Sequence, residues 1–225
     1  MSAALEALES APQGTSLAEN AYLLLRDRLI MLDVKPGDPI NDGQIAAELG
    51  GIGRTPVREA IKRLESDHLV VSYPRRGTFA TGVDITQLAE VSEIRELLEP
   101  LASRKAARMA SPPAMRSELR AVAAAIRDLE GQDNSSQELM RYDIQVHRLI
   151  YKASANAHLE DVLIRYDNLA TRIWCHMLEK MPSVSGHISE HADLLTAIAD
   201  GDEDRAAELA LHHVVSFEET IRKVL

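Results

Sequence analysis

The chain has 225 residues and a mass of 24.8 kDa, with 45% hydrophobic and 27% charged residues, as in an ordinary globular protein of one or two domains. It has no run of about 18 apolar residues and no basic start, so we expect neither a membrane span nor a secretory signal. Its single cysteine, Cys175, excludes an intrachain disulfide and fits a reducing cytoplasm.

The formal net charge is −10 and the isoelectric point about 5.3, which at first sight argues against a nucleic-acid partner. The charge is unevenly distributed, however, because residues 1–82 carry a net charge of −2 and the remainder carries −8. Within residues 50–80, six basic residues stand against three acidic ones. Since salt screens distant charges, a local basic patch is enough to contact phosphates. Net charge therefore does not exclude DNA binding.

The first part of the chain predicts a flexible arm over residues 1–15, then three helices and a hairpin. The expected helices cover residues 16–32, 41–49 and 55–67, and the expected strands cover residues 69–73 and 78–81. The turn between the strands is Pro74-Arg75-Arg76-Gly77. Three helices followed by a hairpin with a basic tip predict a winged helix-turn-helix domain over residues 16–82.

From Asp84 onward the pattern is entirely helical. The expected helices cover residues 84–110, 113–131, 135–154, 156–181, 186–200 and 202–224. Their boundaries carry capping signals, such as Ser111 before Pro112 and Ser135 followed by Glu138. Six helices with short connections predict an antiparallel bundle over residues 84–225, so the fold class is mainly α.

The third expected helix is the most informative segment. Its apolar face consists of Val57, Ala60, Ile61 and Leu64, and its opposite face carries Arg54, Arg58 and Lys62. The planar fork of arginine can bridge guanine N7 and O6 or clamp a phosphate. Thr55 is expected to cap the helix, ahead of Pro56. A solvated charged face is the alternative for an isolated helix, but the neighbouring helix and the basic hairpin favour DNA reading.

Residues 29–81 resemble the winged-helix domain of the GntR family of bacterial transcription regulators. The matching motifs are Pro36-Gly37, Arg54-Thr55-Pro56-Val57-Arg58-Glu59-Ala60 and Arg76-Gly77. The resemblance implies that Arg54 and Arg58 contact bases or nearby phosphates in the major groove, and that Thr55 contacts the backbone. It also implies that the wing around Arg75, Arg76 and Gly77 enters the minor groove, with Arg63 as a weaker candidate for a phosphate contact. The sequence departs from the family at Gly53, where Ser or Thr is common.

A second signal lies in the helical part. Asp143 and His147 are four residues apart on an apolar stripe, so both side chains are expected to point into the bundle. A buried carboxylate needs a compensating partner. His191 and His213 each lie 11 residues from Asp202, where two helices turn, so they reach the same height in an antiparallel pair. These four residues, Asp143, His147, His191 and His213, are called the quartet, and they predict a site for Zn, Ni, Fe or Mn.

Each histidine of the quartet taken alone also fits a hydrogen-bonded core residue. His212 falls on a polar row and is assigned to solvent. Four other histidines have no partner at suitable spacing: His68, His158, His176 and His187. The shared height of three histidines and one aspartate favours a metal site over independent core histidines.

Residues 84–225 resemble the FCD ligand-binding domain of FadR-like members of the GntR family, in its shorter, VanR-like form with six helices. The family's metal ligands fall on the quartet. The resemblance implies a small carboxylate or sugar-acid effector beside the metal, with Arg95 and Arg172 as candidate carboxylate contacts. For each arginine a structural salt bridge is the alternative, with Glu99 or Asp143 as the partner.

Together these features predict a cytoplasmic transcription regulator that binds double-stranded DNA, with no enzymatic activity and no membrane partner. One short helix gives limited readout, so we expect a homodimer that docks two recognition helices on a palindromic operator. Repression is expected because the family usually represses. Two alternatives stay open: a metal-responsive regulator in which the ion is the signal, and a metalloenzyme with an accessory winged-helix domain.

Overall fold

The computed structural model describes residues 16–110, 112–181 and 184–225, and the chain divides after Asp84 into two compact units. The expected flexible arm at residues 1–15 and the expected helix boundary at Ser111 lie outside the described residues. Among the helices that the structure describes, none has the length and apolarity that crossing a membrane requires.

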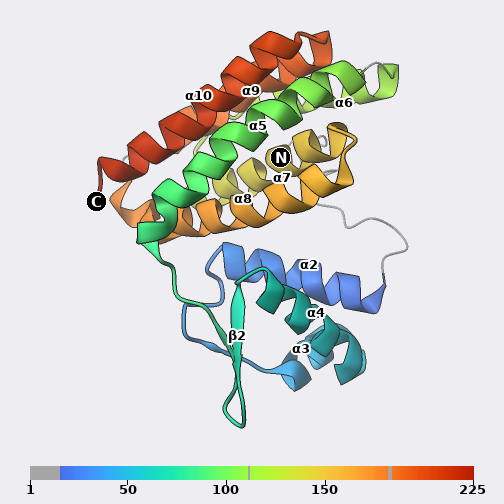
Figure 1. The fold of residues 1–225 in the computed structure, drawn as a ribbon, viewed down its shortest axis with the longest axis vertical. Helices are drawn as coiled ribbons and strands as arrows, with labels where there is room; N and C mark the ends of the chain where they lie inside the picture. The colour runs from blue at the N-terminus through green and yellow to red at the C-terminus, as the bar shows by residue number, and fades with distance from the viewer. Residues whose placement is uncertain (1–15, 111, 182–183) are drawn as a thin grey trace. The chain divides into compact units, whose positions relative to one another are not determined.

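The first unit is a winged helix-turn-helix domain, as predicted (Figure 1). Its helices are α2 (Leu17–Ile30), α3 (Asp42–Glu48) and α4 (Arg54–Ser66), and its strands are β1 (Pro39–Ile40), β2 (Val70–Tyr73) and β3 (Gly77–Ala80). The antiparallel sheet has the order β1-β3-β2, with Val70 opposite Ala80 and Pro39 opposite Phe79. Strand β1 was not expected. Proline is tolerated there because an edge strand has one side free of the ladder.

Packing between α2 and α4 forms the core of this unit. Leu25, Leu29 and Leu64 are each at most 1% exposed. Side chains cap two of its helices: Ser16 accepts a hydrogen bond from the Glu19 amide at the start of α2, and Asn41 accepts from the amides at the start of α3. With its apolar face held against α2, α4 necessarily turns its basic face outward.

The second unit is an all-α antiparallel bundle, also as predicted. Its elements are η1 (Ile85–Gln87), α5 (Leu88–Met109), α6 (Pro113–Arg127), α7 (Ser136–Ala153), α8 (Ala157–Met177), η2 (Leu178–Lys180), α9 (Ser185–Asp200) and α10 (Glu203–Arg222). Helix α5 packs against α7, α8, α9 and α10, and α6 packs on α9. Figure 1 shows α10 running alongside α5. Helix α5 is therefore central to the bundle.

Most helix boundaries follow the capping signals. Ser135 and Glu138 form a reciprocal capping box at the start of α7. Gly201 adopts a left-handed conformation with φ of 77°, which lets the chain turn from α9 into α10 at Asp202. Three expectations were too long: α5 begins at Leu88 rather than Asp84, α6 ends at Arg127 rather than Gly131, and α8 ends at Met177 rather than Met181. Single 3₁₀ turns precede α5 and follow α8.

Candidate metal centre and DNA-contacting surface

Helix α4 presents a basic face on the side opposite its buried residues. Its buried residues are Val57, Ala60, Ile61 and Leu64, and its exposed basic residues are Arg54, Arg58, Lys62 and Arg63. Arg58 Nε donates a hydrogen bond to Asp42 Oδ2 on α3 at 2.8 Å, although the Arg58 side chain remains 64% exposed. The geometry therefore leaves Arg54 and Arg58 accessible, and their contact with DNA stays a prediction.

Two residues of this helix have local roles that differ from the rest of the basic face. Thr55 is exposed but does not cap the helix as expected, because α4 already begins at Arg54 and Gly53 is the cap. Arg63 places its guanidinium carbon 3.8 Å from the centre of the Tyr22 ring and forms an ion pair with Glu19. These contacts tie Arg63 to α2, and its side chain is 49% exposed compared with 64% for Arg58.

The turn between β2 and β3 forms an exposed wing with two arginines at its tip. The Arg76 amide donates a hydrogen bond to the Tyr73 carbonyl at 3.1 Å, which closes the turn. Arg75 has φ of 63° and Gly77 has φ of 98°. A left-handed conformation costs a non-glycine residue about 1–2 kcal/mol, and such strain is found at functional positions. Arg75, Arg76 and Gly77 are all exposed, as a groove-entering wing requires.

In the second unit the quartet comes together inside the bundle. Asp143 and His147 project from α7, His191 from α9 and His213 from α10. One ligand atom from each of the four residues lies within 4.8 Å of all the others. His147 Nε2 is 3.3 Å from His213 Nε2 and 3.4 Å from His191 Nε2. The structure therefore brings together the four side chains that the sequence predicted would meet, while metal binding itself stays a prediction.

These distances fit a tetrahedral metal site. Ligand nitrogens that surround an ion at 2.0–2.1 Å in a tetrahedron are separated by about 3.3–3.4 Å, which matches the separations of His147 Nε2 from the Nε2 atoms of His213 and His191. Asp143 Oδ1 lies 3.7 Å from His191 Nε2 and, within the described residues, has no hydrogen-bond partner although it is buried. A buried carboxylate oxygen without a donor is costly, and a divalent ion would compensate it.

Protonation of the quartet is strongly perturbed by its surroundings. Burial lowers the pKa of His191 and of His213 well below the usual range, so both imidazoles are neutral and offer a lone pair. Burial raises the pKa of Asp143 to about 7. Burial acts to lower the pKa of His147, but the carboxylates of Glu99 and Asp167 outweigh it and raise that pKa to about 9.

His187 belongs to the same cluster, and sequence reasoning missed it. The prediction that His187 has no partner at suitable spacing is wrong, because it lies one helical turn before His191 on α9. Its ring stacks on Trp174 at 4.4 Å and on His213 at 4.0 Å between centroids. Its Nε2 lies 3.6 Å from Asp143 Oδ1. The i, i+4 spacing to His191 was the available signal. His212, by contrast, is 69% exposed in its side chain, as expected.

A buried ionic network lies next to the quartet and involves one predicted effector contact. Arg95 donates hydrogen bonds to Glu99 Oε1 through Nε at 3.1 Å and through Nη2 at 2.9 Å. Arg95 Nη2 also lies 3.4 Å from Asp167 Oδ1. The salt bridge to Glu99, which was the alternative interpretation of Arg95, is therefore present. Effector contact by Arg95 stays a prediction and requires exchange of these partners.

Arg172, the other predicted effector contact, lies on α8 and is 2% exposed. Burial lowers its pKa to about 10, so it remains charged at neutral pH. Its guanidinium is thus held inside the unit that contains the quartet, where an anionic group would be stabilised. Its role toward an effector stays a prediction.

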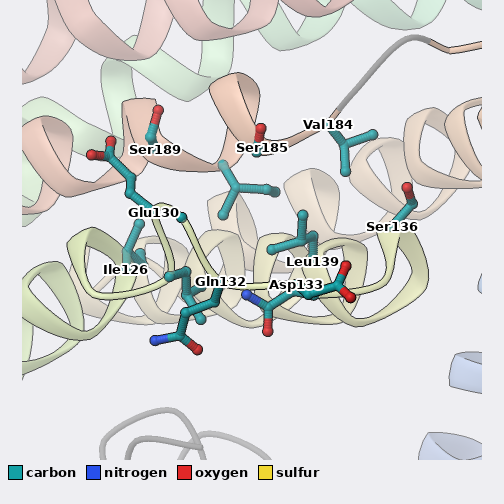
Figure 2. A pocket seen from close by; sticks show the side chains of 13 residues that line it. Ile126, Glu130, Gln132, Asp133, Ser136, Leu139, Val184, Ser185 and Ser189 are labelled. Atoms are coloured by element: carbon teal, nitrogen blue, oxygen red, sulfur yellow. The ribbon is translucent and has the colours of Figure 1, made fainter.

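A pocket of about 540 Å³ opens beside the start of α9, apart from the quartet. Figure 2 shows residues of the connection between α6 and α7 on one side of it and residues of α9 on the other. Glu130 and Asp133 give the pocket an acidic wall, which disfavours a carboxylate ligand. No member of the quartet lines it. The pocket therefore does not supply the anion site that the sequence predicts.

Comparisons with known families cover most of the chain. Residues 17–80 match the gntR family of bacterial regulatory proteins, and residues 90–216 match the FCD domain. These two matches correspond in position to the winged-helix domain and to the helical bundle.

Individual proteins show the same organisation. An uncharacterised HTH-type transcriptional regulator of Streptomyces ambofaciens is 28% identical over 94% of this chain and 87% of its own length. The Nta operon transcriptional regulator of Aminobacter aminovorans is 27% identical over 85% of this chain and 88% of its own length. Among solved structures, Escherichia coli McbR/YncC aligns with a TM-score of 0.79 at 21% identity, covering 93% of this chain and 98% of its own.

Proposed function

We propose a specific mode of action for this chain, which belongs to the GntR family of bacterial regulatory proteins and carries an FCD domain. Membership makes it a DNA-binding transcription regulator and not an enzyme. In our proposal residues 16–82 of a homodimer bind a palindromic operator and repress transcription. A small carboxylate or sugar acid then releases the DNA when it binds at a metal ion in the bundle of residues 84–225.

The exposed basic face of α4 and the wing support the DNA-binding half of the proposal. Arg54 and Arg58 would read the major groove, because both are exposed on one face of the short helix α4. Arg75 and Arg76, which are exposed at the wing tip, would enter the minor groove. One domain of this size makes few base contacts, and a two-fold pair of domains doubles them at half-sites one helical turn apart.

The observation that supports effector binding at a metal ion is that the four residues of the quartet converge. Three imidazole nitrogens and one carboxylate oxygen within 4.8 Å form a donor set suited to Zn or Ni, and also to Fe or Mn. A bound ion would supply a Lewis-acidic anchor for one oxygen of the effector carboxylate. In this arrangement Arg172 would neutralise a second oxygen, as its buried positive charge permits.

Burial of the quartet dictates how the effector reaches it. Asp143, His147, His191 and His213 are each at most 3% exposed. Exchange of an effector therefore requires local opening of the bundle. An effector that binds one arrangement of the bundle more tightly than another shifts the population between them, and this difference is the free energy available for control of DNA binding.

Two measurements test the proposal. In the first, duplexes selected by the protein from a random pool are bound by wild type, Arg54→Ala and Arg58→Ala at moderate salt. Unchanged affinity in both variants would refute the recognition-helix assignment. In the second, a panel of small carboxylates and sugar acids is screened by thermal shift, before and after chelation. Ligands at the ion raise the melting temperature only while metal is present, whereas release of DNA by metal alone, without any carboxylate, supports the metal-sensor alternative.

A further inference from the structure

The three histidines of the quartet point their Nε2 atoms at one another, so their Nδ1 atoms face away from the proposed ion. His147 Nε2 contacts the Nε2 atoms of both His191 and His213. A metal-binding histidine needs its second ring nitrogen protonated and held, since that hydrogen bond fixes both tautomer and ring orientation. The groups that meet the Nδ1 atoms therefore decide how well the quartet is prepared for metal.

We propose that Glu99, acting with Tyr151, and Glu190 are positioning residues that hold His147 and His213 in the metal-binding tautomer. They set the affinity of the site for a divalent transition ion without touching that ion. This inference rests on the metal site of the proposed function, and it adds residues from outside the quartet that sequence reasoning did not assign.

Hydrogen counting at Tyr151 supports the first half of the inference. The Tyr151 hydroxyl lies 2.5 Å from Glu99 Oε1 and 3.2 Å from His147 Nδ1. A hydroxyl has one hydrogen, and the shorter contact to a carboxylate oxygen takes it. The Tyr151 oxygen then accepts from His147 Nδ1–H, so Nε2 is the ring nitrogen whose lone pair would bind an ion. Glu99 Oε2 also lies 3.4 Å from His147 Nδ1 and attracts the same proton.

Glu99 is held in place for this task. It is 2% exposed, and Arg95 binds its Oε1 through two nitrogens at 2.9 and 3.1 Å. The Arg95 guanidinium and the Tyr151 hydroxyl thus converge on one carboxylate, which in turn faces His147. A buried carboxylate with such donors stays ionised and keeps its orientation. Arg95 therefore acts on the metal site indirectly, because it fixes the carboxylate that faces His147.

Glu190 plays the matching part at His213. Its Oε2 lies 2.9 Å from His213 Nδ1, and its Oε1 accepts from the Ser216 hydroxyl at 3.2 Å. A carboxylate has no hydrogen to donate when ionised, so His213 carries the proton on Nδ1 and directs the Nε2 lone pair toward the quartet. Carboxylate–histidine–metal arrangements of this kind raise the basicity of the ligating nitrogen.

Metal affinity measured on purified full-length chain tests the inference. Wild-type protein is stripped with a chelator and titrated with Zn²⁺ alone against a chromophoric competitor, and the visible spectrum is recorded with Co²⁺ in the same site. Glu190→Gln and Tyr151→Phe should each weaken Zn²⁺ binding by roughly 10- to 100-fold and shift the Co²⁺ bands. Glu208→Gln on α10, an exposed glutamate paired with Arg205, is the matched control and should change neither.

The possible results distinguish a failure of the positioning role from a failure of the metal site on which it rests. Wild type that binds no Zn²⁺, or binds it equally well as Asp143→Ala, would overturn both. Zn²⁺ binding that depends on Asp143 but is unchanged in Glu190→Gln and Tyr151→Phe would overturn the positioning role alone. Tyr151→Phe keeps the Arg95–Glu99 pair, so it should fold even where Glu99→Gln fails. A loss of melting temperature in the metal-free variants without a change in the Co²⁺ spectrum would indicate a structural role and also contradict the inference.

Discussion

Replacement of Arg58 by alanine probes the DNA-binding surface most directly. A well-placed arginine contributes about 1–3 kcal/mol of discrimination at a base. In the free protein Arg58 is paired with Asp42 at 2.8 Å, and an exposed pair of this kind is worth about 0–1 kcal/mol. Since that pair must open on binding, Arg58→Ala should weaken operator binding by roughly 5- to 100-fold. Folding stability should fall by less than about 1 kcal/mol.

The ion pair between Arg58 and Asp42 predicts the opposite effect on DNA binding for a substitution of Asp42. Asp42→Asn removes a negative charge beside the phosphates and frees Arg58 before DNA arrives. Operator binding by Asp42→Asn should therefore be tighter, by up to about fivefold, which corresponds to about 1 kcal/mol. Because the gain acts through Arg58, much of it should disappear when Arg58→Ala is also present. Combining the two substitutions in a double-mutant cycle measures this coupling.

Fluorescence anisotropy over a series of salt concentrations is the appropriate assay. Arg205→Ala on α10 is the matched control, because Arg205 is also exposed and paired with a carboxylate. A phosphate contact by Arg58 would lower the salt slope by about 1, whereas a base contact would relax sequence preference. Wild-type affinity, slope and preference in Arg58→Ala would show that α4 does not read DNA through this side chain.

Four further predictions concern the wing, the core and the ion. Arg75→Gly should stabilise the first unit by up to about 1–2 kcal/mol by relieving the left-handed conformation, and should weaken DNA binding; denaturant unfolding and anisotropy measure the two effects. Leu64→Ala should lower the free energy of unfolding of that unit by about 2–5 kcal/mol, since Leu64 is fully buried, and unfolding followed by circular dichroism checks it. Chelation should remove about 2.7 kcal/mol of stability where free metal had been 100 times its dissociation constant, seen as a lower melting temperature; an unchanged melting temperature would contradict a bound ion. Asp143→Ala should reduce metal content in elemental analysis, while His212→Ala should retain it.

Local signals in the sequence were sufficient for most of the fold. Helical periodicity and caps such as Ser135 with Glu138 depend only on nearby residues, so they predicted the helices and their order. Strand β1 has two residues, which is too few for a period, and its pairing with β3 is decided by tertiary packing. For the same reason the contact of Arg63 with Tyr22 could not be predicted, because it depends on how α2 packs on α4.

The candidate metal site was also predictable only in part. Equal distances from the turn at Asp202 predicted that His191 and His213 would meet, because helix geometry alone fixes their height. His187 was missed although it lies four residues before His191, because its stacking on His213 requires the packing of α9 on α10. Glu99 was named only as a possible partner of an arginine, and its contact with His147 could not be predicted because it requires the packing of α5 on α7.

Glu99 lies on α5, and this position gives the proposed ion a mechanical connection to the rest of the chain. Only seven residues separate the end of β3 at Ala80 from the start of α5 at Leu88. Strand β3 is therefore joined by a short connection to the helix that contacts a histidine of the quartet through Glu99. A change in how Glu99 is held at His147 acts on α5 itself, and the covalent chain carries α5 directly into the strand that borders the wing.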